Sequence, residues 1–169
     1  FSEFPITIND DFSDAKELTG NSATETATNL YAGKEDEEPD HAGNRGGKSR
    51  WWSWTPDSNC SVRIDTEGST FDTLLAVYTG VHVSRLVEVA SNDNKKGYTS
   101  MVIFEALADT TYHIAVDGKF LQQWYAVDEG EIILNLSATP YSVDDTGLVD
   151  AVESPPWLSW MTGGTGHWF

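Results

Sequence analysis

Two acidic segments near the start of the chain could supply oxygen ligands to a hard cation. Asn9-Asp-Asp11 places three oxygen-bearing side chains in a row, and Glu35-Asp-Glu-Glu38 together with Asp40 supplies five more. Calcium takes about six to eight oxygen ligands from carboxylates, amides, carbonyls and water, and it would relieve the repulsion between these acids. The residues fit an alternative equally well, in which Asp10 or Asp11 caps a short helix and the second segment is a solvated acidic loop.

A further oxygen-rich group consists of Asp72 with Asn92, Asp93 and Asn94. Asp72 opens one expected strand and residues 92–94 close the next, so a hairpin would bring them together. Asn and Asp side chains also stabilise turns by accepting nearby backbone N–H groups. We therefore expect a structural turn here, with a second cation site as the alternative.

An aromatic segment, Lys119-Phe-Leu-Gln-Gln-Trp-Tyr125, is the clearest candidate for ligand binding. The rings of Trp124 and Tyr125 could stack on pyranose faces, and the neighbouring Gln amides could bond hydroxyl groups. Trp51, which we expect to be partly exposed, could join them. The alternative is that these aromatic residues cover the open end of the domain, because exposed aromatic rings are costly unless they are used or covered.

The sequence offers little support for catalysis. It contains no Gly-x-Ser-x-Gly, His-Glu-x-x-His or P-loop motif. The histidines lack the pairwise spacing of a zinc site; they are His41, His82, His113 and His167. We predict that the protein is not an enzyme.

The composition narrows the choice of partners and compartment. A formal net charge of -17, from 27 acidic and 10 basic residues, argues against binding nucleic acid or an anionic membrane surface. It fits a salty extracellular medium, uptake of divalent cations, or solubility alone. The single cysteine, Cys60, excludes an intrachain disulfide and is expected to be a buried residue. No apolar run approaches the ~20 residues that span a bilayer.

The elements that must position these residues are mostly strands. After an extended lead-in over 1–8, caps around 9–12 predict one short helix over about 11–18, and residues 33–48 form a long polar loop. Short strands separated by turn signals are typical of a sandwich or barrel; we expect them at 23–31, 49–55, 60–66, 72–79, 83–90, 100–107, 110–117 and 130–138. Alternation predicts which side chains face the core: Trp52, Trp54, Val62, Ile64, Val102, Phe104, Ala106, Tyr112, Ile114, Val116, Ile132, Leu134 and Leu136.

The regular pattern ends near residue 139. We expect one module over 1–139 and an acidic, proline-containing linker over 140–156. The aromatic segment 157–169 either packs back onto the module or begins a following one.

Six blocks in the expected order resemble the bacterial pre-peptidase C-terminal domain family, and the resemblance spans about Asn9 to Leu136. The blocks are Asn9-Asp-Asp-Phe-Ser-Asp-Ala15, Glu38-Pro-Asp-His-Ala-Gly43, Gly47-Lys-Ser-Arg-Trp-Trp-Ser-Trp-Thr55, Ser69-Thr-Phe-Asp-Thr-Leu-Leu-Ala-Val-Tyr-Thr-Gly80, Ala90-Ser-Asn-Asp93 and Thr111-Tyr-His-Ile-Ala-Val-Asp-Gly118.

The resemblance implies an all-β, jelly-roll-like antiparallel β-sandwich that serves as a non-catalytic accessory module of a larger secreted or cell-surface bacterial protein. It also implies calcium, with Asn9, Asp10 and Asp11 in the lead-in and Glu38 and Asp40 in the loop as the matching positions. Partners would be the neighbouring domains of the same protein and a polysaccharide or protein surface. The loop is longer here than in simpler members of the family.

Overall fold

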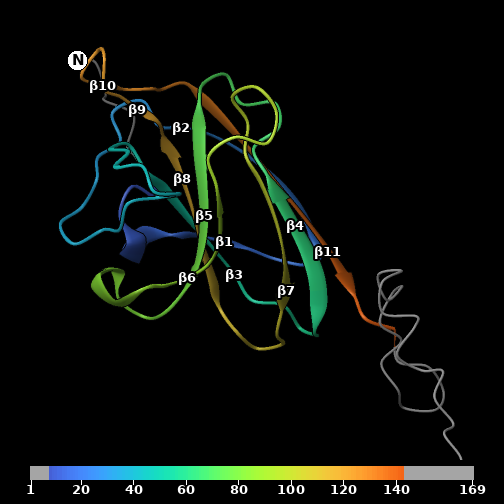
Figure 1. Ribbon diagram of the computed structural model, residues 1–169. Helices are drawn as coiled ribbons and strands as arrows, with labels where there is room; N and C mark the ends of the chain where they lie inside the picture. The colour runs from blue at the N-terminus through green and yellow to red at the C-terminus, as the bar shows by residue number, and fades with distance from the viewer. Residues whose placement is uncertain (1–7, 143–169) are drawn as a thin grey trace, which may run out of the picture.

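The computed structural model describes residues 8–142, which fold into a sandwich of two β-sheets (Figure 1). In spatial order, the first sheet consists of β1 (Lys16–Leu18), β3 (Arg50–Trp54), β8 (Tyr112–Gly118), β5 (Thr73–Thr79) and β6 (Val87–Asn92). The second consists of β2 (Ser22–Thr28), β11 (Glu131–Pro140), β4 (Cys60–Asp65) and β7 (Met101–Ala106). A small hairpin pairs β9 (Phe120–Leu121) with β10 (Ala126–Val127). All pairs except β1 with β3 are antiparallel, so the predicted all-β sandwich is confirmed.

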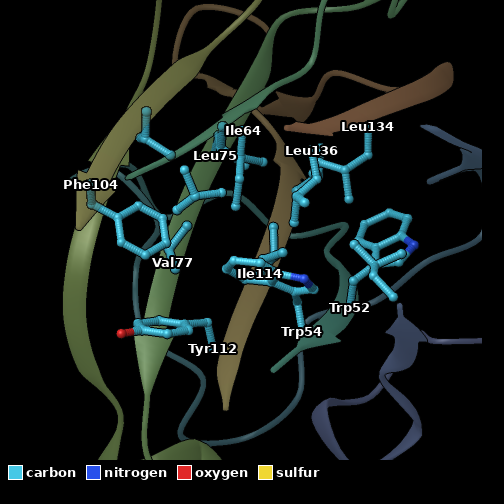
Figure 2. Close-up of a cluster of buried hydrophobic side chains, with 14 of the residues drawn as sticks. Trp52, Trp54, Ile64, Leu75, Val77, Phe104, Tyr112, Ile114, Leu134 and Leu136 are labelled. Carbon is cyan, nitrogen blue, oxygen red and sulfur yellow. The ribbon is translucent and has the colours of Figure 1, made fainter. Parts of the chain in front are cut away.

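The core lies between the two sheets and follows the predicted alternation. Every side chain that alternation assigned to the inner face is buried, including Trp52, Trp54 and Ile114 in the first sheet and Leu134 and Leu136 in the second. Figure 2 shows these side chains pointing toward one another between the ribbons. Burying one such side chain stabilises the fold by about 1.5–3 kcal/mol, so the alternating pattern is sufficient to hold the sheets together.

The predicted helix over 11–18 is wrong. Only a single 3-10 turn, η1 (Phe12–Asp14), forms there, and Lys16–Leu18 is a strand paired in parallel with β3. So short a helix gains little from its own hydrogen bonds, whereas a strand satisfies the open edge of β3 and buries Leu18 in the core. The other turn, η2 (Val83–Arg85), replaces the start of the strand expected over 83–90, which begins at Val87. No helix within residues 8–142 has the length and apolar character needed to cross a membrane.

A second, smaller cluster covers the outer face of the first sheet. Trp51, Ala76, Tyr78 and Ala115 are buried there, and Phe12 packs against them from the lead-in. Trp51 has 0 % of its surface exposed. The expectation that Trp51 is partly exposed, and could therefore bind a ligand at the surface, is wrong because Phe12 and His41 of loop 33–48 pack over its ring.

Candidate functional site

Loop 33–48 is held against the lead-in by side chain to backbone hydrogen bonds. Asp10 Oδ1 accepts from the N–H of Gly33 at 2.9 Å, and Glu35 Oε1 accepts from the N–H of Phe12 at 2.9 Å. Glu38 Oε2 in turn accepts from the N–H of Glu35 at 2.9 Å. The two acidic segments recognised in the sequence therefore meet, and their carboxylates form the junction.

The carboxylates at this junction, which we call the acidic junction, belong to Asp10, Asp11, Glu35 and Glu38. No three of them bring ligand atoms within 4.8 Å of one another. Burial raises the pKa of Glu35, and the negative charges of Asp11, Glu38 and Asp10 raise it further, against the lowering effect of the Phe12 N–H. A carboxylate whose ionisation is disfavoured by acidic neighbours, as that of Glu35 is, would be stabilised in its charged form by a cation bound beside it.

Two of the predicted calcium ligands have other partners. The amide of Asn9 is buried and donates from Nδ2 to the backbone oxygen of Trp51 at 2.8 Å. Asp40 points outward, with 60 % of its side chain exposed, and its Oδ1 lies 2.7 Å from Lys34 Nζ. Asp10, Asp11 and Glu38 are the predicted ligands that lie at the acidic junction. Both oxygens of Glu38 already have hydrogen-bond partners, His41 and the N–H of Glu35, and Oδ1 of Asp10 has the N–H of Gly33.

Behind the acidic junction lies a buried hydrogen-bonded chain centred on His41. Nε2 of His41 lies 2.8 Å from Glu38 Oε1, and Nδ1 lies 2.7 Å from the hydroxyl of Tyr78. In the neutral imidazole, the Tyr78 O–H donates to Nδ1 and the Nε2–H donates to Glu38. Burial, followed by nearby acidic charges, raises the pKa of Tyr78, so its hydroxyl stays protonated. Both imidazole nitrogens are satisfied.

Asp117 of β8 completes this buried group and anchors the end of the loop. Its carboxylate accepts from the N–H groups of Gly47, Lys48 and Gly118 at 2.7–3.1 Å. Burial raises the pKa of Asp117, while His41 and the loop N–H groups oppose that rise. These bonds tie the C-terminal end of the loop to the centre of the first sheet.

Glu38, His41 and Asp117 are the one set of three His, Cys, Asp or Glu side chains in residues 8–142 whose ligand atoms all lie within 4.8 Å of one another. The sequence analysis did not predict this set, and no local motif could have revealed it, because Asp117 comes from a distant strand. Two carboxylates and an imidazole could bind a metal in principle. Here each imidazole nitrogen already has a hydrogen-bond partner and all three residues are buried, which fits a structural role.

The second acidic group, Asp72 with residues 92–94, is neutralised in part by the side-chain ammonium of Lys119. Lys119 Nζ lies 3.0 Å from Asp93 Oδ2 and 3.7 Å from Asp72 Oδ2. Burial raises the pKa of Asp72, and Lys119 opposes this rise. Asn92, the last residue of β6, accepts through Oδ1 from the N–H of Met101, the first residue of β7, at 3.1 Å. The structural role expected for this group is therefore favoured, and Lys119 is the member that the sequence analysis missed.

The aromatic segment forms the β9–β10 hairpin. Trp124 and Tyr125 are 74 % and 76 % exposed, so the alternative that they cover the end of the sandwich is wrong. Tyr125 is held edge-on against Phe120 with ring centroids 5.5 Å apart, and the guanidinium of Arg45 lies 3.9 Å from the Phe120 centroid. The hairpin thus presents a supported aromatic surface to solvent.

No family model matches the sequence, and no curated protein matches it. The structure is similar to the crystal structure of the pre-peptidase C-terminal domain of collagenase from Bacillus anthracis, with a TM-score of 0.41 and 13 % sequence identity over 74 % of this chain and 94 % of that chain. That domain bears the name of the family that the sequence blocks resemble.

The cysteine is placed as the sequence predicted. Cys60 is buried at the start of β4, and burial raises the pKa of its thiol. A buried thiol with a raised pKa is a poor nucleophile, because the thiolate is the reactive form. Cys60 therefore acts as a small core residue.

Proposed function

We propose that the chain is a non-catalytic accessory module of a larger secreted or cell-surface protein, and that calcium bound at the acidic junction stabilises it. The observation that supports calcium is the grouping of Asp10 and Asp11 with Glu35 and Glu38, whose negative charges add to the effect of burial in raising the pKa of Glu35. A divalent cation there would offset the repulsion and fasten the lead-in to the loop. The sequence blocks support the accessory role.

Asp11 is the most informative ligand to change. Its side chain is exposed and makes no capping hydrogen bond to η1, so the fold does not depend on it. Asp10, by contrast, bonds the Gly33 N–H, and its replacement would disturb the loop directly. Asp11→Asn therefore separates loss of the metal from loss of the fold. Asp36→Asn, on an exposed neighbour in the same loop, is the matched control.

Thermal unfolding of the full chain in EDTA and in millimolar calcium tests the proposal. Calcium should raise the melting temperature, because a ligand at about 100 times its Kd stabilises the folded state by about 2.7 kcal/mol. The rise should shrink in Asp11→Asn and persist in Asp36→Asn. Coincident unfolding curves in EDTA and calcium would overturn the proposal of a calcium site.

A second candidate function is carbohydrate binding by the β9–β10 hairpin. The observation that favours it is the exposure of Trp124 and Tyr125 on a hairpin braced by Phe120 and Arg45. Aromatic rings that are held in place lose little entropy when a ligand stacks on them. Exposed Gln122 and Gln123 lie beside them with amide groups for hydroxyls.

Affinity electrophoresis in gels that contain soluble polysaccharides tests this second candidate. We expect retardation by at least one polysaccharide, its loss in Trp124→Ala, and no change in Tyr98→Ala, a residue that is also exposed but lies outside the hairpin. Equal mobility of the wild type and Trp124→Ala in every polysaccharide gel, together with equal binding of the two on a glycan array, would contradict a sugar-binding role for the hairpin.

A further inference from the structure

Arg50 occupies a position where the alternation of β3 calls for an apolar side chain. Arg50, Trp52 and Trp54 lie on the same, inward face of the strand, and Arg50 is only 3 % exposed. Its Nε donates to the backbone oxygen of Thr28 at 2.7 Å and its Nη1 to that of Ile8 at 3.0 Å. Further N–H groups of the guanidinium remain available, because the guanidinium has five of them.

No ion pair neutralises this charge within the part of the chain that the structure describes. All the ion pairs there involve other cations, and none places a carboxylate oxygen within 4.0 Å of Arg50. A buried charge without a counterion costs several kcal/mol. Burial lowers the pKa of Arg50, and Asp10 opposes this from a greater distance. The chain has 27 acidic and 10 basic residues, so a buried arginine without an acidic partner is unexpected.

Arg50 borders a cavity of about 180 Å³ at the open side of the sandwich, between the edge strands β1 and β2. Trp52 also borders it; this residue is 1 % exposed, and its Nε1–H has no hydrogen-bond partner among residues 8–142. In Figure 2 the Trp52 ring lies at the margin of the labelled cluster. The apolar part of the lining comes from Ile8, Ala27 and Leu30.

We propose that this cavity binds a small aliphatic carboxylate. The carboxylate would accept from the guanidinium of Arg50 and the indole N–H of Trp52, and the aliphatic part would lie against Ala27 and its apolar neighbours. A single negative charge matches the single buried cation. Lys16 and Glu25 also border the cavity but pair with each other, so a doubly charged phosphate or sulfate would keep an unmatched charge there. This ligand site is distinct from the proposed calcium site and does not depend on it.

The test is a titration of the full, ¹⁵N-labelled chain with butanoate in EDTA, followed by NMR of the indole N–H of Trp52, which Trp52→Phe assigns. We expect a saturable shift of that resonance, because the indole N–H gains an acceptor. Butanamide, which has nearly the same shape without the charge, should shift it far less. Absence of a saturable shift with butanoate, or an equal response to butanamide, would overturn the proposal.

Variants show whether Arg50 and the cavity bind the ligand. Arg50→Gln should weaken butanoate binding at least tenfold, while Arg85→Gln, on an exposed arginine, should leave it unchanged. If Arg50→Gln does not fold, Ala27→Leu serves instead, since it fills the cavity and keeps the guanidinium. Unchanged affinity in Ala27→Leu, or an equal response to sulfate, would contradict a carboxylate site in this cavity.

Discussion

The imidazole Nε2 of His41 lies 2.8 Å from the carboxylate Oε1 of Glu38, and neither side chain has any exposed surface. Both residues belong to loop 33–48, and the other imidazole nitrogen bonds Tyr78 on β5. A loop that is almost devoid of apolar side chains is thereby fixed to the sheet through a buried polar contact. The same contact positions Glu38 at the acidic junction.

Removing the imidazole of His41 should destabilise the protein more than removing its hydrogen-bond partner on the sheet, the hydroxyl of Tyr78. His41→Leu leaves the Glu38 carboxylate buried without its partner, and we expect a loss of about 2–4 kcal/mol in urea unfolding. Tyr78→Phe leaves only Nδ1 without its partner and should cost about 1–2 kcal/mol. His82→Ala, on an exposed histidine, should cost less than about 1 kcal/mol. An unchanged stability of His41→Leu would contradict a structural role for the chain of hydrogen bonds.

Two glycines of the loop should respond differently to alanine. Both Gly43 and Gly46 have positive φ, at 73° and 53°. A Cβ on Gly43 meets no atom within 4 Å, whereas a Cβ on Gly46 would lie 1.7 Å from Asp117 Oδ2. Gly43→Ala should therefore cost only the backbone penalty of about 1–2 kcal/mol.

Gly46→Ala must in addition displace the Asp117 carboxylate from the loop N–H groups that it bonds. We expect it to cost at least about 2 kcal/mol more than Gly43→Ala in urea unfolding. Equal stabilities of the two variants would show that Asp117 does not hold the loop closely.

The metal-free protein should gain stability on mild acidification through Glu35. Its pKa is raised in the folded state above the ordinary value of 4.5, mainly by burial and then by neighbouring acids. A carboxylate with a raised pKa favours the folded state below its unfolded pKa, and that contribution is lost as the pH rises through the folded pKa. In EDTA, stability should therefore decline as the pH rises from 4.5 toward neutrality.

Glu35→Gln removes this titration and should flatten the decline, while Asp36→Asn, on its exposed neighbour, should not. Melting temperatures measured in EDTA across this pH range provide the check. A Glu35→Gln profile that is parallel to the wild-type profile would contradict a role for Glu35 in the repulsion at the acidic junction.

Lys119→Met should expose the repulsion between Asp72 and Asp93. In the wild type, Lys119 opposes the effect of burial on the pKa of Asp72. Without the ammonium, this pKa should therefore rise further above its ordinary value of 3.8. We expect a loss of about 1–3 kcal/mol at neutral pH, diminishing as the pH falls and Asp72 protonates. Lys95→Met, on an exposed lysine, is the control.

Calcium distinguishes the two interpretations of this group. If the group is a structural turn, calcium should stabilise Lys119→Met no more than it stabilises the wild type in thermal unfolding. A larger calcium effect in Lys119→Met would show that Lys119 replaces a metal ion at these carboxylates.

The sequence by itself determined the sandwich and its inner faces. Strand alternation is a local property, so Trp52, Trp54 and Ile114 could be assigned to the core without knowing which strands pair. The clustering of acids in the lead-in and the loop is likewise visible along the chain. Charge alone could not say which of them meet, and Asp40 proved to lie outward, paired with Lys34.

Only the tertiary structure decided which residues on the outer face of the first sheet are covered, and which polar groups far apart in the sequence form pairs. Alternation correctly placed Trp51 opposite Trp52, but only the folded chain shows that loop 33–48 and Phe12 cover that face. The helix expected over 11–18 became strand β1 because the edge of β3 offered hydrogen bonds that a short helix cannot match. The contact of His41 with Tyr78, and the lack of a carboxylate from residues 8–142 beside Arg50, result from packing between segments far apart in the sequence. Pairing of polar groups in the interior is a property of three-dimensional proximity, and no local pattern encodes it.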